Sequence, residues 1–314
     1  MGAYGNFRAT VVVPTHDHGA TLRHSVGSAL RQTVEDIEVL IVGDGMPDQA
    51  REVAVEVADS DRRVRLFDNP KGERLGELHR HAALEKARAP VVLYLSDDDL
   101  WFPEHVETMV AALDSSGADF VHASPIWRMG DGTYYRWIVD LAQEPYRQLI
   151  FKGENRLGLS SGGHTLDAYR RLPHGWRSAP KDQYSDAWMW RQFAEQPNVT
   201  FVCTTAPTVL HLPSSVRPDW TAEQRLTELA TCAEMLTDPA QRLALLTNLY
   251  ESELDRLTWL ETRGWELEGW VADRERAIAW QAERAERAES TVQAMRASRR
   301  WRIGERVRRV FSRP

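Results

Sequence analysis

Short apolar runs alternate with amphipathic segments over residues 8–100, and this alternation limits the possible folds more than any other feature. Apolar runs at 9–13, 37–42, 64–67 and 91–95 are separated by segments with helical spacing at 21–31, 51–58 and 75–87. Repeated strand–helix units predict a mostly parallel sheet with helices on both faces. Nearly continuous apolar strands are typical of burial on both sides. The sequence therefore predicts an α/β fold of the Rossmann type.

Three consecutive carboxylates, Asp97, Asp98 and Asp99, follow the apolar run at 91–95. In an open α/β sheet, ligands bind at the carboxyl ends of the strands. Adjacent carboxylates repel one another unless a cation neutralises them, and oxygen ligands suit Mg²⁺ or Mn²⁺. The pattern predicts a metal site here, and the alternative is a solvated acidic turn that caps the next helix.

Composition narrows the class of protein. The 314 residues carry a formal net charge of −7, which argues against a general nucleic-acid binder. The two cysteines, Cys203 and Cys232, form neither a metal-binding pattern nor a disulfide framework, so we expect a reducing, cytoplasmic setting. No apolar run reaches the roughly 18 residues of a membrane span, and no signal peptide is visible.

The sequence pattern changes after residue 124. Residues 125–183 are rich in Trp, Tyr, Arg, Gly and Pro, which indicates an irregular region that shapes a pocket. A helix is expected at 185–193, a strand at 199–203 and further helix at 221–249. We expect a catalytic domain over 1–220, with halves at 1–124 and 125–220, and a helical extension over 221–295.

A seven-residue repeat can be placed on the extension from 254 to 295, and it predicts a long helix with coiled-coil spacing. Its two seam positions hold, in order, Leu257, Gly264, Val271, Ile278, Ala285 and Val292, and then Leu260, Leu267, Arg274, Gln281, Ala288 and Met295. A homo-oligomer is one expected assembly.

The last segment, 296–314, is basic on an otherwise acidic chain. It carries eight arginines and one acid, Glu305, while Ile303, Val307, Val310 and Phe311 share one helical face. Such a tail can lie peripherally on the inner face of a membrane or pack on protein, and both readings stand.

Four stretches between residues 8 and 212 occur in an order and spacing typical of one enzyme family. They lie at 11–18, at 28–32 together with 38–45, at 97–103, and at 184–186. This set resembles the family 2 glycosyltransferases, which have the GT-A fold and transfer a sugar from a nucleotide sugar with inversion. Gly43, Ser96 and Ser185 stand where that family usually has an acid.

The resemblance implies a binding site for the nucleotide half of the donor. Asp44 would accept the N3–H of a uracil-like base, which favours UDP or dTDP sugars. Turn formation is the alternative for Asp17 and Asp44, and surface exposure is the alternative for the arginines. The residues implied in nucleotide binding are Pro14, Thr15, Asp17, Asp44, Arg74, Arg80 and Asp97.

The resemblance also assigns the reacting half of the site. Asp186 would be the general base that takes the proton of the acceptor hydroxyl, and the alternative for it is a helix cap. The implied ligands of Mn²⁺ or Mg²⁺ are Asp98, Asp99 and His211. The implied sugar- or acceptor-binding residues are Gly162, Gly163, His164 and Trp188.

The expected partners are a nucleotide-sugar donor and a sugar or lipid-linked glycan acceptor, in the synthesis of a cell-surface polysaccharide or glycoconjugate. Two other classes remain open. One is a nucleotidyltransferase, although residues 14–19 contain no lysine or arginine for a triphosphate. The other is a non-catalytic nucleotide-sugar-binding scaffold that oligomerises through its C-terminal helix.

Overall fold

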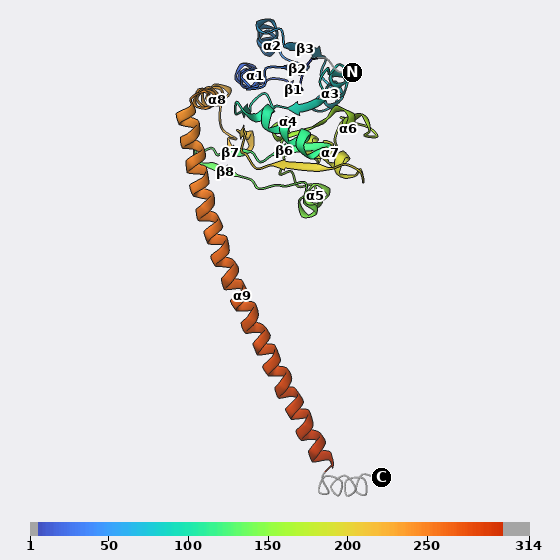
Figure 1. Cartoon of the computed structure of the whole chain (residues 1–314), viewed down its shortest axis with the longest axis vertical. Helices are drawn as coiled ribbons and strands as arrows, with labels where there is room; N and C mark the ends of the chain where they lie inside the picture. The colour runs from blue at the N-terminus through green and yellow to red at the C-terminus, as the bar shows by residue number, and fades with distance from the viewer. Residues whose placement is uncertain (1–5, 298–314) are drawn as a thin grey trace. The chain divides into compact units, whose positions relative to one another are not determined.

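The computed structural model describes residues 6–297, so nearly all of the predicted basic tail lies outside the described residues. The chain divides into a unit that ends at Leu249 and a second unit from Tyr250 onward. The first unit is built on a seven-stranded sheet of order β10-β6-β9-β4-β1-β2-β3 (Figure 1). Its strands are β1 (Ala9–Thr15), β2 (Ile37–Asp44), β3 (Val64–Asn69), β4 (Val91–Tyr94), β6 (Phe120–Ala123), β9 (Gly162–Thr165) and β10 (Phe201–Thr204).

The prediction of a mostly parallel sheet is confirmed. β1 pairs in parallel with β2 and β4, β2 with β3, and β6 with β10. The exception is β9, which lies antiparallel between β4 and β6. This strand comes from the region that was predicted to be irregular, so that prediction is wrong for Gly162–Thr165.

Helices cover both faces of this sheet because successive residues of each buried strand point to opposite sides. Val11 and Val13 pack with α1, α2 and α4 on one face, whereas Val12 packs with α3, α6 and α7 on the other. The helices of the first unit are α1 (Thr21–Leu30), α2 (Asp48–Ser60), α3 (Glu77–Leu84), α4 (His105–Ser116), α5 (Glu144–Phe151), α6 (Leu166–Arg170), α7 (Ser185–Ala194) and α8 (Ala222–Thr237).

A smaller sheet of order β5-β11-β7-β8 forms a separate hydrophobic cluster with α8. Leu100, Ile126 and Leu210 from this sheet pack against Leu229 and Leu236 of α8. The first unit therefore includes α8, because the apolar face of α8 is buried on the sheet. The strands of this sheet are β5 (Leu100–Trp101), β7 (Ile126–Arg128), β8 (Tyr134–Arg136) and β11 (Val209–His211).

The C-terminal helix is confirmed as long and continuous. α9 spans Pro239–Ala297, 59 residues. The segment predicted to be helical over 221–249 contains two helices, since α8 ends at Thr237 and the Asp238 carboxylate accepts a hydrogen bond from the Ala240 amide at 2.8 Å at the start of α9. Among residues 6–297 we find no helix with the length and apolarity of a membrane span.

Candidate active site

The loops that follow β1, β2 and β4 meet at one edge of the main sheet, because these three strands are parallel neighbours. The His16 ring nitrogen Nδ1 lies 2.7 Å from the Asp44 carbonyl, and His18 Nδ1 lies 2.8 Å from the Asp97 carboxylate. The first loop thus contacts both of the others. Pro14 and Thr15 are the last residues of β1, and Asp17 is exposed beside them.

A groove of about 620 Å³ opens beside this edge. Asp17 and His18 line it together with residues of α1, α2 and α8. The predicted nucleotide loop therefore borders a space large enough for part of a ligand. His18 was not among the predicted site residues. Its position in the loop after the first strand is the sequence feature that could have identified it.

Asp44 is held by a loop between β3 and α3. Its carboxylate accepts hydrogen bonds from the Lys71 ammonium and from the Gly72 amide at 2.5 Å, and His79 lies 3.6 Å away. Burial opposes ionisation of Asp44, but Lys71 and the Gly72 amide outweigh it and hold the pKa of this carboxyl below its usual value. Asp44 is therefore an anionic acceptor at the end of β2.

The three acids after β4 differ in their surroundings. Asp97 pairs with His18, and this contact raises the pKa of His18 to about 9. Asp98 accepts a hydrogen bond from the Ser96 hydroxyl at 2.6 Å. Burial, followed by the charges of Asp99 and Asp97, raises the pKa of Asp98 to about 6. Asp98 is thus the member of the triplet with the least local compensation for its charge.

Asp99 is held by several neighbouring donors, and its predicted role as a metal ligand stays a prediction. Its oxygens accept from His211 Nδ1 at 2.8 and 2.9 Å, from the Leu212 amide at 3.0 Å and from the Ser160 hydroxyl. These contacts use the acceptor positions of a carboxylate. Burial opposes the charge of Asp99, but His211 outweighs it and lowers the pKa of Asp99.

Among the described residues, ligand atoms of His18, Asp97 and Asp98 lie within 4.8 Å of one another and could hold a divalent cation. Because Nδ1 of His211 faces Asp99, its Nε2 is the nitrogen left to bind a metal, as is common where a carboxylate orients a histidine ligand. Burial lowers the pKa of His211, but the charges of Asp99, Asp98 and Asp186 raise it overall. A half-buried carboxylate with unbalanced charge and an oriented imidazole suit Mn²⁺ or Mg²⁺.

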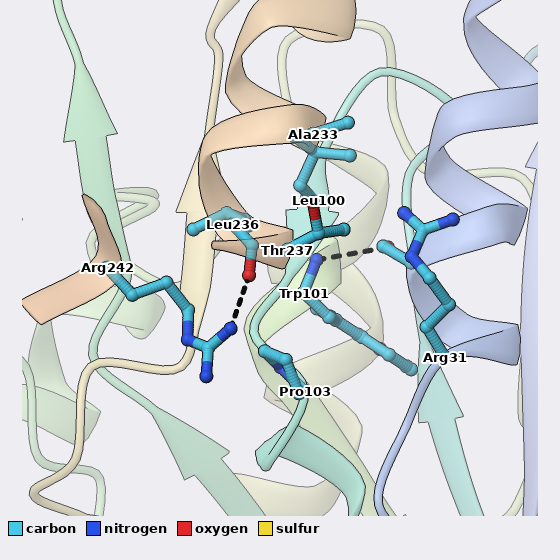
Figure 2. A pocket seen from close by; sticks show the side chains of 9 residues that line it. Arg31, Leu100, Trp101, Pro103, Ala233, Leu236, Thr237 and Arg242 are labelled. Atoms are coloured by element: carbon cyan, nitrogen blue, oxygen red, sulfur yellow. Dashed lines mark hydrogen bonds between the residues drawn. The ribbon is translucent and has the colours of Figure 1, made fainter. Parts of the chain in front are cut away.

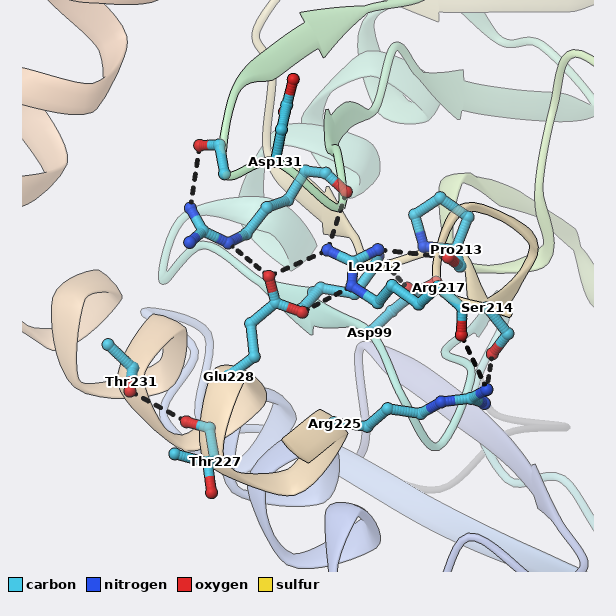
Figure 3. Close-up of polar contacts among 12 residues, drawn as sticks. Asp99, Asp131, Leu212, Pro213, Ser214, Arg217, Arg225, Thr227, Glu228 and Thr231 are labelled. Carbon is cyan, nitrogen blue, oxygen red and sulfur yellow. Dashed lines mark hydrogen bonds and ion pairs between the residues drawn. The ribbon is translucent and has the colours of Figure 1, made fainter. Parts of the chain in front are cut away.

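The loop that follows His211 is fixed by a buried ion pair (Figure 3). Arg217 is 1% exposed and donates to both carboxylate oxygens of Glu228 on α8, at 2.6 and 2.9 Å. Arg128 donates to the same carboxylate at 2.7 Å. α8 therefore anchors the segment that carries His211 and Leu212, a contact that the sequence did not predict.

Asp186 lies in the first turn of α7, as predicted. Its Oδ1 accepts from the Asn155 amide and from the Ala187 backbone, both at 2.8 Å. Burial raises the pKa of Asp186, which suits a general base. The side chain does not cap α7, whose N-cap is Tyr184.

Arg74 holds a neighbouring loop, and its predicted role in nucleotide binding stays a prediction. Its guanidinium donates to the carbonyls of Ala179 at 2.6 Å, Gln183 at 2.6 Å and Lys181 at 3.3 Å, and also to that of Pro180. The Lys71 ammonium in turn donates to the Arg74 carbonyl at 2.7 Å. Arg74 thus ties the Asp44 side of the site to the loop that precedes Asp186.

Arg80 lies below the site rather than in it. It is 3% exposed, stacks 4.3 Å from the Trp176 ring centroid and donates to the Leu75 carbonyl. Its buried Nε has no partner among the described residues. Burial lowers the pKa of Arg80, and the charges of Glu77, Asp186 and Asp44 oppose that shift. Arg80 thus acts electrostatically on Asp186, and its predicted contact with phosphates stays a prediction.

His164 and Gly163 belong to the sheet, which corrects their predicted contact with sugar. His164 is fully buried, and its Nε2 and Nδ1 lie 2.7 Å from the Tyr94 hydroxyl and 2.9 Å from the Thr165 carbonyl. A Cβ on Gly163 would lie 2.3 Å from a Leu93 methyl carbon. Gly162 likewise lies too close to a neighbour to carry a side chain, because a Cβ there would lie 2.7 Å from the Trp190 ring.

Trp188 stays at the edge of the site. It is half-buried, with the guanidinium groups of Arg177 and Arg191 at 5.4 and 5.5 Å from its ring, and its Nε1 is buried without a partner among the described residues. Its role in binding sugar remains a prediction.

A separate cavity of about 190 Å³ lies behind Trp101 (Figure 2). Arg31 and Arg242 stand on opposite sides of it, and the Trp101 amide donates to the Ser28 hydroxyl at 3.1 Å. None of the predicted site residues lines this cavity. It is therefore distinct from the site at the strand ends.

A comparison with known protein families identifies the family of this chain. The sequence model of glycosyl transferase family 2 matches residues 10–171, which is more than half of the chain. The chain belongs to glycosyl transferase family 2. The match covers the loops after β1, β2 and β4, and it ends before Asp186 and His211.

Named relatives of this family 2 chain align over its N-terminal part. Validoxylamine A glucosyltransferase of Streptomyces hygroscopicus is 32% identical over 105 residues, 33% of this chain and 25% of that protein. The Escherichia coli UDP-Glc:alpha-D-GlcNAc-diphosphoundecaprenol beta-1,3-glucosyltransferase WfgD is 24% identical over 119 residues, 38% and 46%. In these two alignments the chain spans between a quarter and a half of the relative's length.

Among solved structures, the fold of this family 2 chain is similar to that of Staphylococcus aureus TarS. A crystal structure of TarS residues 1–349 with UDP-GlcNAc matches with a TM-score of 0.52 and 14% identity, over 74% of this chain and 68% of that one. The similarity confirms the predicted GT-A fold.

Proposed function

We propose that this chain is an inverting glycosyltransferase that moves a sugar from a UDP-type nucleotide sugar to an acceptor hydroxyl. The observation that carries the proposal is the meeting of the loops after β1, β2 and β4, where His16 Nδ1 lies 2.7 Å from the Asp44 carbonyl and His18 Nδ1 lies 2.8 Å from the Asp97 carboxylate. The candidate nucleotide acceptor and the candidate cation ligands therefore lie at one edge of the sheet, as a sugar transfer requires.

The donor proposal rests on Asp44 and on the comparisons. Asp44 offers an anionic acceptor at the end of β2, which suits the N3–H of a uracil ring. TarS has been solved with UDP-GlcNAc and with UDP, and WfgD is named for UDP-Glc. The Lys71 ammonium, which now holds Asp44, would have to turn away for the base to bind.

The reaction needs a base on the acceptor side. Asp186 Oδ2 would take the hydroxyl proton as that oxygen attacks the anomeric carbon opposite the leaving nucleotide. Asn155 and the Ala187 amide hold Oδ1, so the carboxylate keeps one orientation. A divalent cation bound by Asp98 and His211 would supply positive charge that stabilises the diphosphate leaving group.

The proposal also includes the class of acceptor. The Rhizobium meliloti protein ExoW, which is 28% identical over 137 residues, is named for succinoglycan biosynthesis. WfgD is named for a diphosphoundecaprenol acceptor. A growing glycan is therefore the acceptor class that we propose.

A panel of nucleotide sugars tests the function. The full chain should be stabilised against heat by UDP sugars more than by GDP sugars, and Mn²⁺ should increase this effect. Release of UDP from one of these donors should follow when glycan acceptors are added. No stabilisation and no hydrolysis with any UDP or dTDP sugar would contradict the proposal.

A further inference from the structure

The second unit carries apolar side chains that nothing in the described chain covers. Leu257, Leu260, Leu267, Val271 and Ile278 on α9 are between 46% and 61% exposed. A helix with this much exposed apolar surface gains little from burial and is typical of an interface. The spacing and charges of this helix indicate which partner would cover these side chains.

The apolar residues recur at two positions of a seven-residue repeat. The first seam position holds Leu257, Gly264, Val271, Ile278 and Ala285, and the second holds Leu260, Leu267, Arg274 and Gln281. β-Branched residues at the first position with leucine at the second favour two parallel strands. Val271 and Ile278 meet the first condition, and Leu260 and Leu267 meet the second.

Charges beside the two seam positions have a consistent sign. The residues just before the first seam positions are, in order, Arg256, Arg263, Trp270, Ala277 and Arg284, and those just after the second seam positions are Glu261, Glu268, Glu275, Ala282 and Glu289. In a parallel, in-register pair of helices, each residue just before a first seam position lies beside the residue five positions later in the other helix. Arg256 would then face Glu261, Arg263 would face Glu268, and Arg284 would face Glu289 of the other copy.

The opposite orientation would bring like charges together. In an antiparallel pair, the arginine side of one helix faces the arginine side of the other, and glutamate faces glutamate. From this charge pattern we propose that α9 pairs with α9 of a second copy of this chain as a parallel, in-register, two-stranded coiled coil over about residues 256–289.

The contacts that these arginines make within their own helix do not prevent pairing with a second copy. Arg263 bonds Glu266 at 2.7 Å, one turn along its own chain, and the Arg284 guanidinium lies 5.3 Å from the Trp280 ring centroid. Both arginines are exposed, so each can also reach a glutamate of the second copy. The polar seam residues Arg274 and Gln281 reduce stability and restrict the register.

Gly264 offers a gain-of-function test at a seam position. A Cβ built there meets no atom within 4 Å in this chain. Gly264→Leu should therefore tighten the pairing, because it adds an apolar contact and removes a residue that weakens helices. Gly269→Leu, on the outer face, should raise helix content without changing the mass in solution.

Sedimentation of the full chain tests the partner. The wild type should reach a mass of twice 35.9 kDa as concentration rises. A variant with Arg263→Glu and Arg284→Glu, and a second with Glu268→Arg and Glu289→Arg, should each dissociate about tenfold more readily, because four contacts become repulsive. An equimolar mixture of the two variants should form mixed dimers. A single-chain mass for the wild type at every concentration would overturn the proposal.

Cysteine cross-linking tests the direction and register. Val271→Cys should give an interchain disulfide under mild oxidation, since residue 271 meets itself only in a parallel, in-register pair. Thr262→Cys, on the outer face, is the matched control and should not cross-link. A dimer in which Val271→Cys gives no more cross-linking than the control would overturn the parallel arrangement.

Discussion

At the scale of the residue, neighbours give three identical acids different properties. Asp97 is paired with His18, and Asp99 is saturated by Ser160, His211 and Leu212. Only Asp98 has burial and two like charges acting on it together, which raise its pKa to about 6. Asp98 is therefore the acid for which a cation would relieve the most electrostatic cost.

Asp98→Asn should abolish cation binding without unfolding the chain. We expect Mn²⁺ affinity to fall by at least the roughly 10- to 100-fold seen when outer-shell groups are lost. The melting temperature in metal-free buffer should stay the same or rise, because one buried like charge is removed. Calorimetric titration of Mn²⁺ measures the first effect. Asp59→Asn, exposed on α2, is the control, and unchanged affinity in Asp98→Asn would reject this ligand.

Asp186→Asn should separate chemistry from binding. The amide keeps the hydrogen bond from Asn155 or Ala187 but cannot accept a proton, so turnover should fall by about 10²-fold or more. The dissociation constant for UDP should change little, because the proposed role of Asp186 is to contact the acceptor and not the nucleotide. Initial rates and fluorescence titration with UDP measure these quantities. Equal losses in both would indicate that Asp186 has a structural role instead.

At the scale of the element, Arg74 joins two loops that are about a hundred residues apart in sequence. Its planar guanidinium reaches four backbone carbonyls of the loop at 179–183, which no ammonium group could span. That loop leads directly into α7 and Asp186. Arg74 is therefore a positioning residue for the candidate base.

Arg74→Lys should loosen the 179–183 loop. Amide hydrogen exchange at residues 179–187 should become faster, and turnover should fall by roughly tenfold while UDP affinity stays within a few-fold, since a misplaced base affects mainly the chemical step. Mass-spectrometric exchange measures the first effect. Arg62→Ala, an exposed arginine near β3, is the control. Exchange that is as slow as in the wild type would contradict this role.

At the scale of the whole molecule, several histidines are buried and neutral within the core. Burial lowers the pKa of His105 to about 3 and of His122 and His164 to about 4. His164 shows the consequence in its contacts: Nδ1 donates to the Thr165 carbonyl, and the neutral Nε2 accepts from Tyr94. The Tyr94 hydroxyl accepts in turn from Trp176.

The free energy of unfolding should fall as the pH decreases from 6.5 to about 4.5. The unfolded histidines bind protons near pH 6.5, whereas the folded ones do not until about pH 4, so acid favours the unfolded state. Each histidine can contribute up to about 1.4 kcal/mol per pH unit. Urea titrations at several pH values measure the slope. His164→Gln should reduce it, and exposed His174→Gln should not; an equal slope in all three proteins would refute the assignment.

The sequence by itself determined those features that depend on neighbouring residues. Apolar runs at 9–13, 37–42 and 91–95 predicted three parallel strands, because a strand buried on both faces must be apolar along its length. The acids that follow these strands were placed correctly, since the carboxyl ends of parallel strands share one edge. The long α9 followed from its seven-residue spacing.

Only the tertiary structure decided features that depend on distant partners. Gly162–Thr165 has no local strand signal and becomes β9 because β4 and β6 supply its hydrogen bonds. Asp99 looks like Asp98 in the sequence, and contacts with Ser160 and His211 alone distinguish the two. Arg74 binds four carbonyls of a distant loop for the same reason. These outcomes rest on hydrogen bonds between segments far apart in the chain, which local sequence patterns do not encode.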